Sequence, residues 1–201
     1  MQKYFALIAL GFGVVAVSWL NIDIKQVAAQ TSTPTAVFDP QGRLKLPTDY
    51  RKWVFVGAPL TPNGLNGGSA GFPEYHNVYI QEKDVDAYLK NKVFPEGTVI
   101  IKELTRVLNP TFPDGSTTEP SGRGYFNGVF NGIDATVKDS KKFADSGGWG
   151  YAQFDYDVGS EAFKPADGSS SPPQEHDAKC GFACHTIVAN KDYVFTAYPQ
   201  R

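Results

Sequence analysis

Both cysteines of the chain and two of its three histidines lie within ten residues of one another, between His176 and His185. Cys180 and Cys184 are separated by three residues, and His185 follows the second cysteine directly. Thiolates and imidazoles are nucleophiles, metal ligands and attachment points for cofactors. We therefore expect the functional site in this segment.

Three chemistries fit the cluster. A disulfide is feasible, because residues four apart on a helix have Cα atoms near the ~6 Å that a bridge tolerates, but it gives His185 no role. A zinc site of His176, Cys180, Cys184 and His185 has suitable ligands, although its spacing matches no common zinc module. In covalent haem c attachment, both thiols form thioethers and the following histidine ligates iron. The usual spacer has two residues, so Gly181 would have to absorb the extra one.

The only methionine is Met1, so a processed chain cannot form the His/Met coordination of ordinary electron-transfer cytochromes. The sixth position of an iron held by His185 would then be open, or filled by His76, His176 or another non-methionine ligand. His76 alternates with Val78 and Ile80, which is also typical of a buried structural histidine. We favour an open iron, which indicates ligand binding or catalysis.

The N-terminus has the layout of a secretory signal peptide: Lys3, an apolar run from Tyr4 to Leu20, and small residues up to Ala29. An uncleaved membrane anchor is the alternative. We expect a signal peptide at 1–29, a flexible arm at 30–48 and a domain at 49–201, located in the periplasm or otherwise exported. Disulfides and haem attachment are both permitted there.

The 201 residues, 41% of them hydrophobic, suit a single domain, and 20 glycines with 14 prolines predict many loops. Alternating patterns predict strands at 74–80, 98–106, 125–138 and 149–157, and a short helix at 84–90. The expected fold class is α+β, mainly an antiparallel β-sheet with a few short helices. A net charge of −2 provides no basic footprint for nucleic acid.

One strand carries a charge on each face. Alternation places Lys102 with Ile100 and Leu104, and Glu103 with the residues on the other face. Periodicity alone does not decide which face points inward.

Three segments, FPEGTVIIKEL (94–104), VKDSKKFADSGGWGYAQF (137–154) and CGFACHTIVANKDYVFTAY (180–198), resemble the cytochrome P460 family. The resemblance covers most of the chain from about Tyr50 to Tyr198. It implies a periplasmic, mostly β, homodimeric protein with one haem c per chain and no membrane association beyond export.

The resemblance also implies roles for single residues. Cys180 and Cys184 would attach the haem, His185 would ligate its iron, and the opposite axial position would be open. In hydroxylamine-oxidising members a lysine is joined to a porphyrin meso carbon, and the matching residue here is Lys102. A related branch, cytochrome c′-beta, lacks this cross-link and binds nitric oxide.

We therefore predict oxidation of hydroxylamine or a related small nitrogen oxide, with a soluble electron acceptor such as another cytochrome c. Candidate proton carriers on the predicted strands are Gln153, Asp155 and Glu103. The alternatives are a non-catalytic, NO-binding or electron-carrying haem protein, and a haem-free exported domain with a Cys180–Cys184 disulfide.

Overall fold

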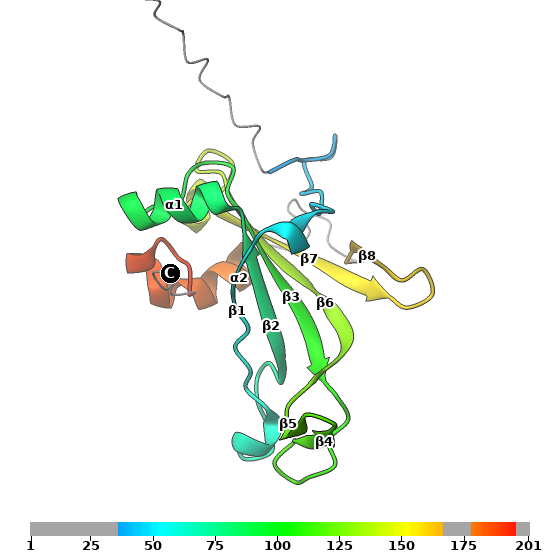
Figure 1. The fold of residues 1–201 in the computed structure, drawn as a ribbon. Helices are drawn as coiled ribbons and strands as arrows, with labels where there is room; N and C mark the ends of the chain where they lie inside the picture. The colour runs from blue at the N-terminus through cyan, green and yellow to red at the C-terminus, as the bar shows by residue number, and fades with distance from the viewer. Residues whose placement is uncertain (1–35, 167–177, 196–201) are drawn as a thin grey trace, which may run out of the picture. The chain divides into compact units, whose positions relative to one another are not determined.

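The fold is built on one antiparallel sheet, seen in a computed structural model that describes residues 36–166 and 178–195 (Figure 1). The six strands of this sheet run in the order β1-β2-β3-β6-β7-β8, and each pairs antiparallel with its neighbours. A separate two-stranded sheet, β4-β5, forms a hairpin in the connection between β3 and β6. These observations confirm the α+β class with a mainly antiparallel sheet.

The strands are β1 Val54–Gly57, β2 Glu74–Ile80, β3 Val99–Val107, β4 Thr117–Glu119, β5 Gly122–Gly124, β6 Asn127–Lys138, β7 Trp149–Asp157 and β8 Ala162–Pro165. The α-helices are α1 Glu82–Asn91 and α2 Ala178–His185. Short 3₁₀ helices span Tyr50–Lys52, Asn63–Leu65, Ala144–Ser146 and Thr186–Lys191.

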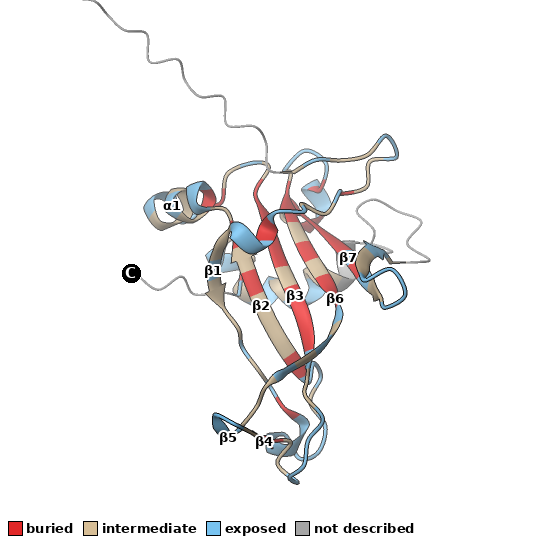
Figure 2. Cartoon of the chain, turned by 45° about the vertical axis from the view of Figure 1, so that its right-hand side comes forward, coloured by how far each residue is buried: buried red, intermediate tan, exposed pale blue. Residues whose placement is uncertain are grey.

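The hydrophobic core lies on both faces of the sheet, and its buried positions run along β2, β3, β6 and β7 (Figure 2). One face, here called the α2 face, packs against α1, α2 and the segment after α2; Ile80, Ile100, Trp149, Tyr151 and Val194 are buried there. The opposite face packs against the N-terminal segment and a loop, burying Leu44, Tyr50, Ile101, Phe143 and Phe154 among others.

The predicted strands at 74–80 and 149–157 match β2 and β7, and those at 98–106 and 125–138 match β3 and β6 with small shifts of their ends. The predicted helix at 84–90 lies within α1. Strands β1, β4, β5 and β8 were not predicted, because each has only three or four residues and too few alternating positions to give a pattern.

Part of the predicted flexible arm is packed onto the domain. Leu44 is 1% exposed, and Phe38 forms an antiparallel bridge with it. The described part of the arm, from Ala36 onward, therefore belongs to the fold. The predicted signal peptide lies outside the described residues, and within these residues no helix is long and apolar enough to cross a membrane.

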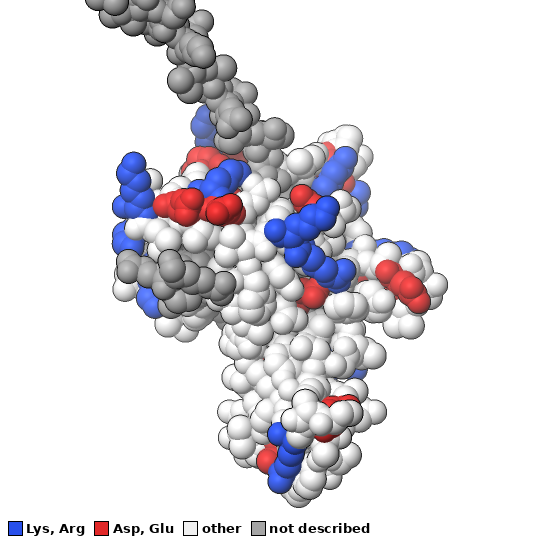
Figure 3. Space-filling model, viewed as in Figure 1, with Lys and Arg blue, Asp and Glu red and all other residues white. Residues whose placement is uncertain are grey.

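On the face shown in Figure 3, positive and negative side chains alternate around α1 and the neighbouring loops, while the surface between α1 and the β4–β5 hairpin is almost free of charge. Strands β1 and β2 run through this region (Figure 1). Two exposed aromatic side chains belong to β1 and the loop before β2: Phe55 is 41% exposed and contacts Tyr79, and Phe72 is 58% exposed and contacts His76.

Candidate functional site

The strand register arranges the candidate residues in three rows across the α2 face. One row is Ile80, Ile100, Thr136 and Tyr151; the next is Val78, Lys102, Asp134 and Gln153; the third is His76, Leu104, Gly132 and Asp155. Because alternate residues of a strand share a face, neighbouring rows lie about 7 Å apart. Lys102 thus stands between the row of Tyr151 and the row of His76.

Lys102 is paired with an acidic residue on the adjacent strand. Its Nζ lies 2.8 Å from Asp134 Oδ2, and the two side chains are 32% and 29% exposed. The ammonium group also lies 5.6 Å from the centre of the Phe72 ring. The structure therefore places Lys102 on the α2 face, which the sequence pattern had left undecided, together with Asp134, which sequence reasoning missed.

His185 is the last residue of α2 and is held by the chain that follows it. Its Nδ1–H donates a hydrogen bond to the carbonyl oxygen of Tyr193 at 2.5 Å, since a carbonyl can only accept. This bond fixes the tautomer and leaves Nε2 as the ring nitrogen for a metal. Burial lowers the pKa of His185, and the charges of Lys102 and Asp134 act on it in opposite directions.

The imidazole of His185 sits between two aromatic rings. Its centre is 5.0 Å from that of Tyr151 and 4.9 Å from that of Phe195. Helix α2 can approach Tyr151 this closely because residue 181 is glycine: a Cβ there would lie 2.5 Å from Tyr151 Cγ. Gly181 is therefore required by packing, a reason that its place between the cysteines did not reveal.

A buried ion pair anchors the segment that carries the Tyr193 carbonyl. Asp192 Oδ1 lies 2.6 Å from Lys138 Nζ, and these side chains are only 10% and 7% exposed. The same carboxylate accepts hydrogen bonds from the backbone N–H of Phe94 at 2.8 Å and from Trp149 Nε1 at 3.3 Å. Asp192 thus ties the polypeptide after α2 to the sheet.

Residues 47–196 match the family model described as cytochrome P460. The chain belongs to the cytochrome P460 family. This match confirms the resemblance seen in the sequence and shows a c-type haem protein. The comparison with curated proteins gives no match.

The described residues fit the cofactor that membership in the cytochrome P460 family implies. His185 presents one free ring nitrogen, and Cys184 in the same helix has an exposed free thiol. Phe72, beside Lys102, and Phe195, beside His185, are 58% and 51% exposed, as expected for side chains that an apolar ring would cover. Cys180 belongs to α2, but its side chain lies outside the described part.

The three predicted proton carriers do not all lie on the same face of the sheet. Gln153 and Asp155 lie on the α2 face, Gln153 directly opposite Asp134. Glu103 lies on the opposite face, where its carboxylate accepts hydrogen bonds from Tyr50 Oη and from Arg51. This placement corrects the inclusion of Glu103: one residue along β3 from Lys102, its side chain points away from the site.

Of the other interpretations of the cysteine cluster, the disulfide gains no support, and the zinc site includes residues outside the described part of the chain. Cys184 is not in a disulfide. The described residues contain no group of three or more His, Cys, Asp and Glu side chains able to hold a metal ion, and His176 lies outside them. Asp134 has a sequence signal in retrospect, since alternation places it with Thr136 and Lys138 on a polar face, opposite the apolar residues of the same stretch.

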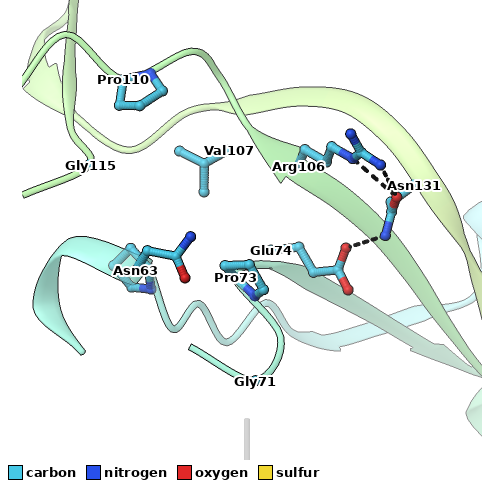
Figure 4. A pocket seen from close by; sticks show the side chains of 10 residues that line it. Asn63, Gly71, Pro73, Glu74, Arg106, Val107, Pro110, Gly115 and Asn131 are labelled. Carbon is cyan, nitrogen blue, oxygen red and sulfur yellow. Dashed lines mark hydrogen bonds between the residues drawn. The ribbon is translucent and has the colours of Figure 1, made fainter. Parts of the chain in front are cut away.

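A separate cavity of about 500 Å³ lies at the far end of β2 and β3 (Figure 4). Three polar side chains on its wall are linked: Asn131 Nδ2 donates to Glu74 at 2.6 Å, and Arg106 donates to Asn131 Oδ1 at 2.9 Å. None of the predicted site residues lines this cavity. The candidate functional site is therefore the surface formed by Lys102, Asp134 and His185.

Proposed function

We propose that this protein is a haem enzyme that oxidises hydroxylamine or a related small nitrogen oxide. The observation that carries the proposal is the position of the Lys102–Asp134 ion pair on the α2 face, in the row next to that of Tyr151, whose ring contacts the imidazole of His185. A lysine at this position is what the hydroxylamine-oxidising branch of the family uses for its link to the porphyrin.

We assign the residues as follows. His185 would ligate the iron through Nε2, Cys180 and Cys184 would hold the haem, and Lys102 would be linked to a meso carbon. Bound haem would supply a Lewis-acid centre that also accepts electrons. The Tyr193 carbonyl keeps the proton of His185 on Nδ1, which makes Nε2 a stronger donor. Asp134 is the nearest carboxylate to Lys102 and would accept protons released from the substrate.

We extend the proposal to the setting of the enzyme. The N-terminal 29 residues would direct export to the periplasm, the active form would be a homodimer, and a soluble protein such as another cytochrome c would take the electrons. N-terminal sequencing of protein recovered from the periplasmic fraction tests the first point. A chain that still begins at Met1 would contradict it.

The central test uses natively matured wild type and the variant Lys102→Ala, with Lys164→Ala as control. Lys164 also forms an ion pair with an aspartate, at 2.6 Å, but lies on β8 at the edge of the sheet. We expect covalently bound haem in all three, steady-state oxidation of hydroxylamine with an artificial electron acceptor in wild type and the control, and an altered absorption spectrum with lost turnover in Lys102→Ala.

Three results would count against the proposal. If the mass of the wild-type protein equals that of the polypeptide alone, no haem is covalently attached and the proposal is wrong. If the absorption spectra of Lys102→Ala and wild type are identical, Lys102 is not linked to the haem. Binding of nitric oxide without any oxidation of hydroxylamine would move the protein to the cytochrome c′-beta type.

A further inference from the structure

His76 presents a buried nitrogen that no described residue satisfies. Its Nε2 is inaccessible to solvent and has no hydrogen-bond partner among residues 36–166 and 178–195. Buried polar atoms in folded proteins are nearly always paired, and an exception calls for an explanation such as a bound molecule. The sequence pattern had suggested an ordinary core histidine, for which a partner would be expected.

The position of His76 relates this atom to the site. His76 lies on the α2 face, opposite Leu104 and one row beyond Lys102. The row of Tyr151, over which His185 packs, is on the other side of Lys102. The two histidines therefore flank the same ion pair from opposite ends of the face.

The neighbours of His76, an apolar ring and a positively charged lysine, favour the neutral form of its imidazole. The Phe72 ring packs edge-on against the imidazole at 6.0 Å, and the same ring lies 5.6 Å from Lys102 Nζ. Burial and then the positive charge of Lys102 lower the pKa of His76, with Asp134 acting in the other direction. A neutral imidazole can accept a hydrogen bond from a small uncharged molecule.

We propose that His76 Nε2 accepts a hydrogen bond from the N–H or O–H group of hydroxylamine bound on the Lys102 side of the site. The inference rests on the proposed function, and it adds a substrate-binding residue that selects ligands carrying a hydrogen-bond donor. Carbon monoxide has no such donor, so the same pocket would bind it without help from His76.

The experiment compares two ligands on the haem-loaded protein. Hydroxylamine is titrated optically without an electron acceptor, and carbon monoxide is titrated after reduction. The variants are His76→Leu, which removes the acceptor, and His76→Gln, whose amide oxygen can replace it. Tyr79→Phe is the control, because Tyr79 lies on the same strand but on the opposite face.

For His76→Leu we expect hydroxylamine affinity to fall by roughly 2- to 13-fold, the range for one lost hydrogen bond, and carbon monoxide affinity to stay unchanged. His76→Gln should lie between this variant and wild type, and Tyr79→Phe should match wild type. Since Nε2 bonds no described residue, His76→Leu should not melt below wild type.

The inference is overturned by unchanged hydroxylamine affinity, by an equal loss for both ligands, or by a six-coordinate wild-type spectrum that becomes five-coordinate in His76→Leu, which would make His76 an iron ligand. Failure of the proposed function looks different. If hydroxylamine binding depends on His76 but no turnover occurs, the proposed oxidation is refuted and the inference about His76 stands. If the wild-type protein contains no haem, both are refuted.

Discussion

The substitution Asp192→Asn tests how the site is held in place. Asparagine keeps the size of the side chain and one oxygen, but it removes the charge that compensates Lys138 in a place where both side chains are at least nine-tenths buried. The new amide group would also face donors on every side, namely Lys138 Nζ, Trp149 Nε1 and the Phe94 N–H. Breaking one partner of a buried pair costs about 3–5 kcal/mol.

A loss of that size corresponds to a fall in melting temperature of roughly 6–20 °C for a domain of this length, at about 2–4 °C per kcal/mol. The matched control is Asp157→Asn. Asp157 pairs with Lys164 at the same distance of 2.6 Å and also accepts a backbone hydrogen bond, but these side chains are 39% and 55% exposed. Exposed pairs contribute little, so this variant should melt close to wild type.

The second readout of Asp192→Asn is the reduction potential of the haem-loaded protein. Tyr193 follows Asp192, and its carbonyl accepts the Nδ1 proton of His185. Loosening this bond makes the imidazole a weaker donor, which stabilises the oxidised iron less, so the potential should become more positive. Equal melting temperatures for the two asparagine variants would refute the reasoning from burial, and an unchanged potential would refute the link to His185.

Three further outcomes are expected. Gly181→Ala should lower the melting temperature and the haem content, because the added Cβ would lie 2.5 Å from Tyr151 Cγ. Alanine favours helices over glycine by about 1 kcal/mol, so a higher melting temperature would contradict this packing. Glu103→Gln should cost about 1.5–3 kcal/mol of stability and leave hydroxylamine turnover unchanged, because Glu103 bonds Tyr50 on the face away from the site. Asp134→Asn should slow turnover roughly 10²- to 10⁴-fold, because Asp134 pairs with Lys102 in the site. Equal turnover rates of the two variants would refute the assignment of these residues to opposite faces. Burial lowers the pKa of His76 in the folded protein below its ordinary value of 6.5. As the pH falls, the unfolded chain therefore binds a proton at this histidine before the folded protein does, and the free energy of unfolding decreases. Between about pH 7.5 and 5, the urea midpoint of His76→Leu should thus drop less than that of wild type.

The long strands and the first helix could be predicted because alternation and helical spacing repeat over seven or more residues. Strand pairing could not, and pairing is what sets Lys102 beside Asp134 although 32 positions separate them in the sequence. The same limit explains Glu103. One charge on each face of a strand is ambiguous until the packing of other elements shows which face is the site.

Residue type predicts the site in the sequence, but it does not predict the contacts that support the site. Cysteine and histidine are rare here, so their clustering carried information, and the family match shows a c-type haem protein. The contacts that orient His185 come from a backbone carbonyl and a buried aspartate, and neither has a sequence signature of its own. The burial of Leu44 was missed for a similar reason, since an isolated apolar residue in a polar segment has no period.

The three-residue spacer between the cysteines has a physical explanation in helix α2. Positions 180 and 184 are one turn apart, and so are Gly181 and His185, each pair lying about 100° from the other around the helix axis. Gly181 and His185 both pack on Tyr151, which fixes that side of the helix against the sheet. With a two-residue spacer the cysteines would still lie on one side of the helix, about 60° apart instead of about 40°, so their own positions do not require the third residue. The three-residue spacer therefore fits the packing on Tyr151, because it places Gly181 one turn before His185, where both residues contact that ring.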